Sequence, residues 1–219
     1  MVIIQIENVR FKVHKSKLIK SETFADMFTV AANSNADSQI MEGSSVEHPI
    51  KLHGVSASDF ECLLTLLYES RYTEQRVDLD ISLALPAFRL AHMWNFTELQ
   101  ACLLPYLEEN LNDVDKIVCA REFDIREWTI PAYIRICRRP EPLKSEEAEK
   151  IGLRGMLLIL RLRDIKDPAT CNSCKSNGRH VQATSYRCSY GHNWGVGGMI
   201  DKTMEETIKA WEENGQVFS

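Results

Sequence analysis

Four residues near the end of the chain have the types and the spacing of a zinc site. Two residues separate Cys171 from Cys174, thirteen residues follow, and three residues then separate Cys188 from His192. Tetrahedral zinc takes thiolate and imidazole ligands from two close pairs, each folded back as a tight knuckle. We therefore predict a zinc site formed by Cys171, Cys174, Cys188 and His192, with His180 as an alternative fourth ligand.

The predicted zinc would have a structural role. Four protein ligands leave no open position for a water molecule, and binding would supply the folding energy that a segment this short cannot obtain from its own core. The alternative hypotheses are reduced thiols in a polar tail, or redox use of the same cysteines. The seven cysteines are an odd number and unevenly spaced, which does not indicate a secreted disulfide framework.

No pattern in the sequence predicts an enzyme. A Gly-rich phosphate loop, a nucleophile elbow and an H-E-x-x-H pair are all missing. Cys62 and Cys102 lie on apolar helix faces with no evident base, so we expect them in the core. His14 and His92 are expected to be structural histidines. We predict no catalytic and no cofactor-binding residues.

The composition excludes some partners. The 219 residues carry a formal net charge of −5, which gives no electrostatic footprint for nucleic acid or for an anionic membrane. No apolar run approaches the roughly 20 residues that cross a bilayer, and the first residues do not form a signal peptide. We expect an intracellular protein, in the cytoplasm or the nucleus, and we do not expect membrane or nucleic-acid partners.

Hydrophobic periodicity predicts strands first and helices afterwards. Two period-2 runs around Glu7 and Asn8 predict a hairpin over 2–13, and a helix capped by Ser21 follows over 21–28. Residues 31–48 are expected to be a loop, and 49–52 a short strand. Ser58 and Glu61 then form a capping box.

Six further helices are expected. We place them around 85–92, 99–107, 114–121 and 128–137, from Ser145 onward, and over 201–211. Pro105 is expected to kink or interrupt its helix. A break is expected at 138–142 and a linker over 164–170. Strands grouped at one end with helices after them indicate an α+β fold.

Three blocks of this order resemble the BTB/POZ family. The first block, residues 11–28, contains F-K-V-H-K-S-K-L and S-E-T-F-A-D-M-F. The second, residues 49–68, contains P-I-K-L, D-F-E and L-L-T-L-L-Y. The third, residues 90–99, is L-A-H-M-W-N-F-T-E-L. The stretch from Glu42 to Phe60 and the helical part after residue 116 also resemble BTB-domain proteins of mushroom-type fungi. The resemblance covers roughly residues 2–165.

The resemblance implies a domain organisation. We expect a BTB domain over 2–110, a helical extension over 111–165, and a Cys/His module with a terminal helix over 166–219. Metazoan BTB homodimers use a helix before the first strand, whereas this chain begins at the first strand. Homodimerisation therefore stays open, and we expect no tight strand-swapped dimer.

The resemblance also implies the kind of function. BTB domains bind other proteins, so we predict a non-enzymatic interaction scaffold or adaptor. One alternative is a substrate adaptor of a cullin ubiquitin ligase, because Ile40, Met41 and Glu42 fit the family's apolar-x-Glu element by position. The other is a transcription-related regulator whose zinc module contacts DNA through basic residues near the cysteines.

Overall fold

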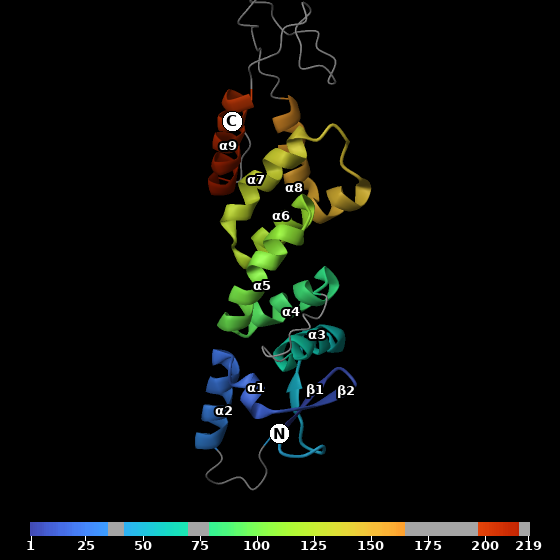
Figure 1. Cartoon of the computed structure of the whole chain (residues 1–219), viewed down its shortest axis with the longest axis vertical. Helices are drawn as coiled ribbons and strands as arrows, with labels where there is room; N and C mark the ends of the chain where they lie inside the picture. Colours follow the sequence, from blue (N-terminus) through green and yellow to red (C-terminus); the bar gives the residue numbers. More distant parts are fainter. Residues whose placement is uncertain (35–41, 70–78, 165–196, 215–219) are drawn as a thin grey trace, which may run out of the picture. The chain divides into compact units, whose positions relative to one another are not determined.

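The computed structural model describes residues 1–34, 42–69, 79–164 and 197–214. The chain divides into two compact units, Met1–Leu111 and Asn112–Ser219, called unit 1 and unit 2 below. Among the described residues, no helix is both long and apolar enough to cross a membrane. Figure 1 labels the helices of both units and the strands β1 and β2.

Unit 1 begins with a three-stranded sheet in the order β2-β1-β3 (Figure 1). Strands β1 (Val2–Ile6) and β2 (Val9–Val13) form the predicted antiparallel hairpin, with Ile6 opposite Val9. Glu7 has a φ of 53°, the left-handed conformation that a two-residue hairpin loop requires. Strand β3 (Ile50–Leu52) pairs with β1 in parallel.

Helices α1 (Lys15–Leu18) and α2 (Glu22–Ser34) follow the hairpin. The predicted cap of α2 is confirmed, because the Phe24 backbone N–H donates to Ser21 Oγ at 3.1 Å. The helix continues through Ser34, so our prediction of a loop from residue 31 was wrong for its first four residues. Ala31–Ser34 continue a helix that Phe24 anchors in the core, although they carry no apolar period of their own.

Helix α3 (Ala57–Tyr68) begins at a different cap from the one predicted. The Asp59 backbone N–H donates to Ser56 Oγ at 3.0 Å, so Ser56 is the N-cap and Ser58 already lies in the first turn. Both serines precede an acidic residue by three positions, and the sequence pattern did not distinguish them.

Two more helices complete unit 1, α4 (Ile81–Met93) and α5 (Thr97–Asn110). Of the kink or interruption predicted at Pro105, the interruption does not occur, because α5 runs through Pro105 as one helix. Aromatic rings form the centre of the core: Trp94 meets Phe24 and Phe60 edge-on, at centroid distances of 5.2 and 5.8 Å. The result is a small sheet packed by helices, the predicted α+β class.

The described part of unit 2 is helical: α6 (Asp113–Phe123), α7 (Arg126–Arg138), α8 (Ser145–Asp164) and α9 (Gly197–Asn214). Asn112 caps α6 by accepting a hydrogen bond from the Asp115 backbone N–H at 2.9 Å. One core joins all four helices, with members including Ile117, Tyr133, Leu158 and Ile208. The terminal helix therefore contributes side chains to the same core as α6–α8.

Candidate functional site

Tyr68 links the end of β2 to the C-terminal end of α3. Its hydroxyl accepts a hydrogen bond from the His14 backbone N–H at 2.8 Å and lies 2.8 Å from His14 Nδ1. Lys17 Nζ donates to the Leu67 carbonyl at 2.9 Å, where a cation suits the negative end of a helix. These contacts make His14 a structural histidine, as the sequence predicted.

Burial disfavours the thiolate form of two described cysteines, Cys62 and Cys137. Burial raises the pKa of the Cys137 thiol to about 11, and desolvation also raises the pKa of Cys62. Both thiols therefore stay protonated at neutral pH, whereas a nucleophilic cysteine requires a thiolate. Cys119 is 1% exposed. Cys102 is exposed, so our placement of it in the core was wrong: it lies on the outer face of α5.

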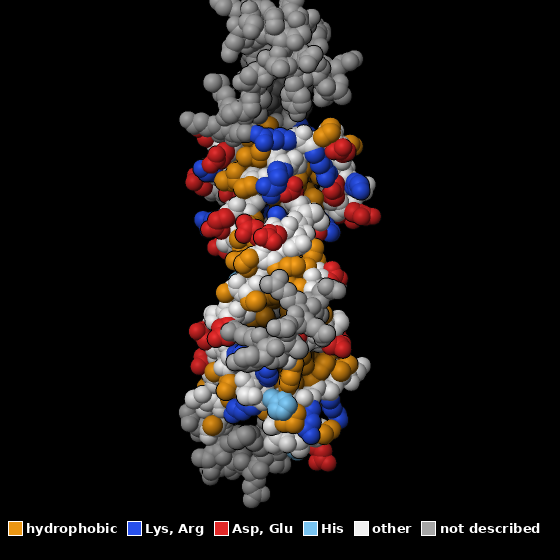
Figure 2. Space-filling model, in the orientation of Figure 1, with side chains coloured by type: hydrophobic (Ala, Val, Ile, Leu, Met, Phe, Trp, Pro, Cys, Tyr) orange, Lys and Arg blue, Asp and Glu red, His pale blue; other side chains and the backbone are white. Residues whose placement is uncertain are grey.

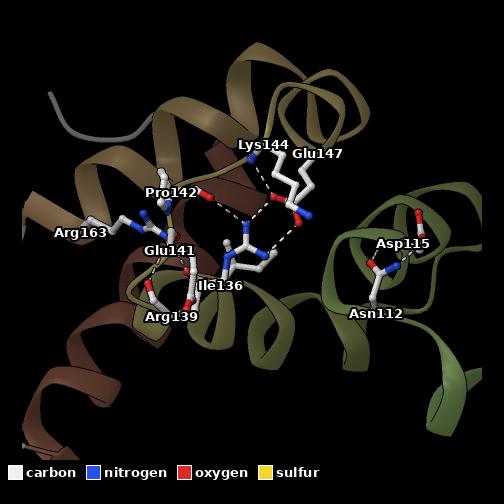
Figure 3. Close-up of polar contacts among 9 residues, drawn as sticks. All are labelled: Asn112, Asp115, Ile136, Arg139, Glu141, Pro142, Lys144, Glu147 and Arg163. Atoms are coloured by element: carbon white, nitrogen blue, oxygen red, sulfur yellow. Dashed lines mark hydrogen bonds and ion pairs between the residues drawn. The ribbon is translucent and has the colours of Figure 1, made fainter.

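Arg139 and Glu147 form a bidentate ion pair in unit 2 (Figure 3). Arg139 Nη1 donates to Glu147 Oε1 at 2.9 Å, and Nη2 donates to Oε2. The Lys144 backbone N–H donates to Glu147 Oε2 at 2.8 Å, which is the glutamate half of a capping box at the start of α8. The hydrogen bonds from Arg139 and Lys144 hold the pKa of Glu147 at about 2.

Arg163 holds the other side of the same turn. Its Nη2 donates to the carbonyls of Ile136 at 2.9 Å, Arg139 at 3.3 Å and Glu141 at 3.0 Å (Figure 3). These carbonyls belong to the last turn of α7 and to the residues after it, where the helix leaves them without partners. The cluster of Arg139, Glu147 and Arg163 therefore fixes the connection between α7 and α8.

Arg121 joins three helices around a glycine. Its Nη1 donates to the Ile151 carbonyl at 2.6 Å, and its Nη2 donates to the Tyr133 hydroxyl at 2.5 Å. The Ile151 carbonyl precedes Gly152, whose φ of 79° breaks α8 into two helical stretches. A Cβ on Gly155 would lie 2.7 Å from both Arg121 Nη2 and the Tyr133 hydroxyl, so the close approach requires glycine.

A cleft of about 730 Å³ lies among the helices of unit 2. Its lining includes side chains of both charges, and at its edge Arg126 pairs with Asp124 at 3.2 Å with both side chains about 80% exposed. Cations and carboxylates nearly balance, so the lining does not define the charge of a ligand. The polar groups of unit 2 that we describe thus stabilise the fold and assemble no reactive centre.

An exposed apolar row runs along α8. Leu153, Leu157 and Leu160 are 68%, 41% and 48% exposed, and their spacing of four and then three residues places them on one helix face. Large exposed apolar side chains in a row are typical of protein-binding surfaces. This row is not among the sites that the sequence predicted, although its spacing is visible there.

Residues 2–111 match the model of the BTB/POZ domain family. The chain belongs to the BTB/POZ family. The match covers unit 1, with its hairpin, parallel third strand and aromatic core. BTB domains are in general protein-interaction modules, so the chain carries a domain of that class. No match to a curated protein is found. The resemblance to BTB proteins of mushroom-type fungi stays a prediction.

Only one residue of the predicted cullin-binding element lies among the residues that the structure describes. Ile40 and Met41 lie outside the described residues, while Glu42 is exposed. Glu42 precedes Gly43, whose carbonyl accepts a hydrogen bond from the Ile3 backbone N–H at 2.9 Å and whose φ is 81°. Glu42 thus lies beside a turn attached to β1, with its side chain in solvent.

All the predicted zinc ligands lie outside the described residues. This holds for Cys171, Cys174, Cys188 and His192, and for His180 as the alternative ligand. Within the described ranges, no group of three or more His, Cys, Asp or Glu side chains is placed to hold a metal ion. The zinc site therefore stays a prediction based on the spacing of its residues.

Proposed function

We propose that the chain is a non-enzymatic adaptor in which the BTB domain and the helical unit each bind a protein. The observation that carries this proposal is the BTB match over residues 2–111. The exposed row of Leu153, Leu157 and Leu160 supports a second contact, because burying it against a partner would remove large apolar side chains from water.

Quantitative affinity purification of the tagged full chain tests the two-contact proposal. The Leu153→Asp, Leu157→Asp variant should lose one set of partners and keep those of the BTB domain. The Arg154→Asp, Arg161→Asp variant alters two exposed neighbours on α8 and is the matched control. Identical partner sets for all three proteins would contradict a contact at the leucine row.

A structural zinc in the C-terminal module is the second part of the proposal. The spacing of Cys171, Cys174, Cys188 and His192 supports it. Purified protein should contain about one zinc per chain, and Cys174→Ser should remove it, with Cys102→Ser as a control at an exposed cysteine of α5. His192→Ala and His180→Ala, compared by the same metal analysis, identify the fourth ligand. Metal-free protein would refute the site.

Binding of a cullin is a narrower candidate function of the BTB domain. The exposure of Glu42 favours it, because a contact residue must be accessible. A purified cullin N-terminal domain should be retained by the full chain and lost with Glu42→Lys. Glu47→Lys makes the same charge change at an exposed position five residues away and should retain the cullin domain. Equal retention by both variants would remove this candidate.

The transcription-related alternative makes a different prediction. A zinc module that contacts DNA should bind duplex DNA with an affinity that falls steeply as salt rises, because neutralised phosphates release counterions. Cys174→Ser should abolish this binding together with the zinc. Absence of salt-dependent binding by zinc-loaded protein would exclude the alternative.

A further inference from the structure

Strand β2 presents basic side chains at an open edge of the sheet. Arg10 and Lys12 are exposed and alternate with Phe11 and Val13, which turn toward the core. In the strand order β2-β1-β3 the far side of β2 has no neighbouring strand among the described residues. Figure 2 shows Lys and Arg side chains gathered around a histidine in this part of unit 1.

The hairpin register directs backbone groups of the same two residues to the open edge. A two-residue loop is closed by a hydrogen-bonded pair, here Ile6 and Val9. Hydrogen-bonded and non-hydrogen-bonded pairs alternate along an antiparallel ladder, so Arg10 and Lys12 occupy non-hydrogen-bonded positions toward β1. Their N–H and C=O groups therefore point away from β1, where an added strand would meet them.

Three cations share one face of the sheet. The register places Arg10, Gln5 and Lys51 in one row across the three strands, and Lys12 lies two residues further along β2 on the same face. None of the three cations has an ion-pair partner within the part of the chain that the structure describes.

This arrangement selects the kind of strand that β2 would accept. Side chains at alternate positions of an extended chain are about 6.8 Å apart, the same spacing as Arg10 and Lys12. A second copy of β2 would place cations opposite cations and is disfavoured. An extended segment with acidic residues at alternate positions would place each acidic residue opposite Arg10 or Lys12, with about 5 Å between the paired Cβ atoms.

We propose that the open edge of β2 binds an extended acidic segment of a partner protein, which adds a fourth strand to the sheet opposite Arg10 and Lys12. Main-chain hydrogen bonds supply affinity in such strand addition, and side-chain pairs supply specificity. The cations have two effects at this edge: they exclude basic and self-complementary strands, and they favour acidic ones. This edge includes neither Glu42 nor the leucine row of α8.

A labelled peptide with glutamate at alternate positions, TEVEVET, tests the proposal against the full chain. Fluorescence anisotropy should detect binding, and Arg10→Glu with Lys12→Glu should weaken it about tenfold or more, since two attractive pairs become repulsive. Arg126→Glu with Arg154→Glu makes the same charge change in unit 2 and should leave binding unchanged. Thermal unfolding confirms that both variants fold.

A second measurement separates strand addition from attraction of charge alone. On binding, the backbone amides of Arg10 and Lys12 should become protected from hydrogen exchange, and a peptide methylated on its edge-facing nitrogens should bind weakly. A lysine version of the peptide should not bind. The proposal is overturned if TEVEVET does not bind, if the two amides stay unprotected, or if duplex DNA or anionic vesicles bind β2 in preference to the peptide.

Discussion

Replacing Glu147 with glutamine removes the charge from the cluster that fixes the connection between α7 and α8. Glutamine keeps the size of the side chain and one acceptor oxygen, so the Lys144 cap can persist. The bidentate ion pair with Arg139 is lost. The Arg139 guanidinium then keeps its positive charge without the carboxylate, and its Nε is already buried without a hydrogen-bond partner. We expect unit 2 to become less stable at neutral pH.

The magnitude follows from the pKa of Glu147. The shift of this pKa from 4.5 to about 2 sets an upper bound of about 3 kcal/mol on what the Glu147 carboxylate contributes to the free energy of unfolding. The side chains of Arg139 and Glu147 are 30% and 22% exposed, so solvent screening reduces the contribution. We expect Glu147→Gln to lower the free energy of unfolding by about 1–2 kcal/mol at pH 7.

The pH dependence has a definite sign. Because the folded state lowers the pKa of Glu147, its contribution is complete above about pH 4.5 and disappears as pH falls toward 2. The stability of the natural protein and of Glu147→Gln should therefore converge across this window. Glu149→Gln alters an exposed carboxylate on the same helix and should have little effect.

Hydrogen exchange of peptides from α7 and α8, measured with increasing urea at pH 7 and pH 3, reports the stability of unit 2 itself. Because the peptides come from α7 and α8 alone, the measurement separates unfolding of unit 2 from unfolding of the BTB domain. A difference between the natural protein and Glu147→Gln that is as large at pH 3 as at pH 7 would refute the electrostatic explanation. So would equal effects of Glu147→Gln and Glu149→Gln at pH 7.

The remaining predictions concern packing and capping, and urea unfolding checks each. Gly155→Ala should cost about 1–3 kcal/mol by displacing Arg121 from Tyr133; Gly54→Ala, with open space around its Cβ, should cost only the strain of its φ of 79°, about 1 kcal/mol. Ser21→Ala should cost about 1–2 kcal/mol, because the fully buried hydroxyl both caps α2 and donates to the Trp94 carbonyl. Ser56→Ala should cost about 1 kcal/mol and Ser58→Ala less than about 0.5 kcal/mol; the reverse order would contradict the assigned cap.

The parts of the fold that the sequence predicted have strong local signals. The hairpin over 2–13 followed from alternation around Glu7 and Asn8, and the cap of α2 from Ser21. Two of the errors arose where local signals were weak or duplicated. Residues 31–34 carry no apolar period, and Ser56 and Ser58 both precede an acid by three positions. Only the packing of the surrounding chain decides such cases.

The polar clusters of unit 2 could not be predicted from local patterns. Arg163 contacts carbonyls 22 to 27 residues away, and Arg121 contacts the Ile151 carbonyl across 30 residues. Arginine is common on exposed helix faces, so nothing in the sequence distinguished these two residues from their neighbours. The basic edge of β2, in contrast, is visible as alternation once the strand and its register are known.

We propose that this BTB protein acts by binding other proteins. Size-exclusion chromatography of a native extract that contains the tagged full chain tests it most directly. We expect the chain to elute in assemblies much larger than its own 25.1 kDa. Either double variant, Arg10→Glu with Lys12→Glu or Leu153→Asp with Leu157→Asp, should shift it to smaller assemblies. Elution of the unaltered chain as a free monomer would contradict the claim.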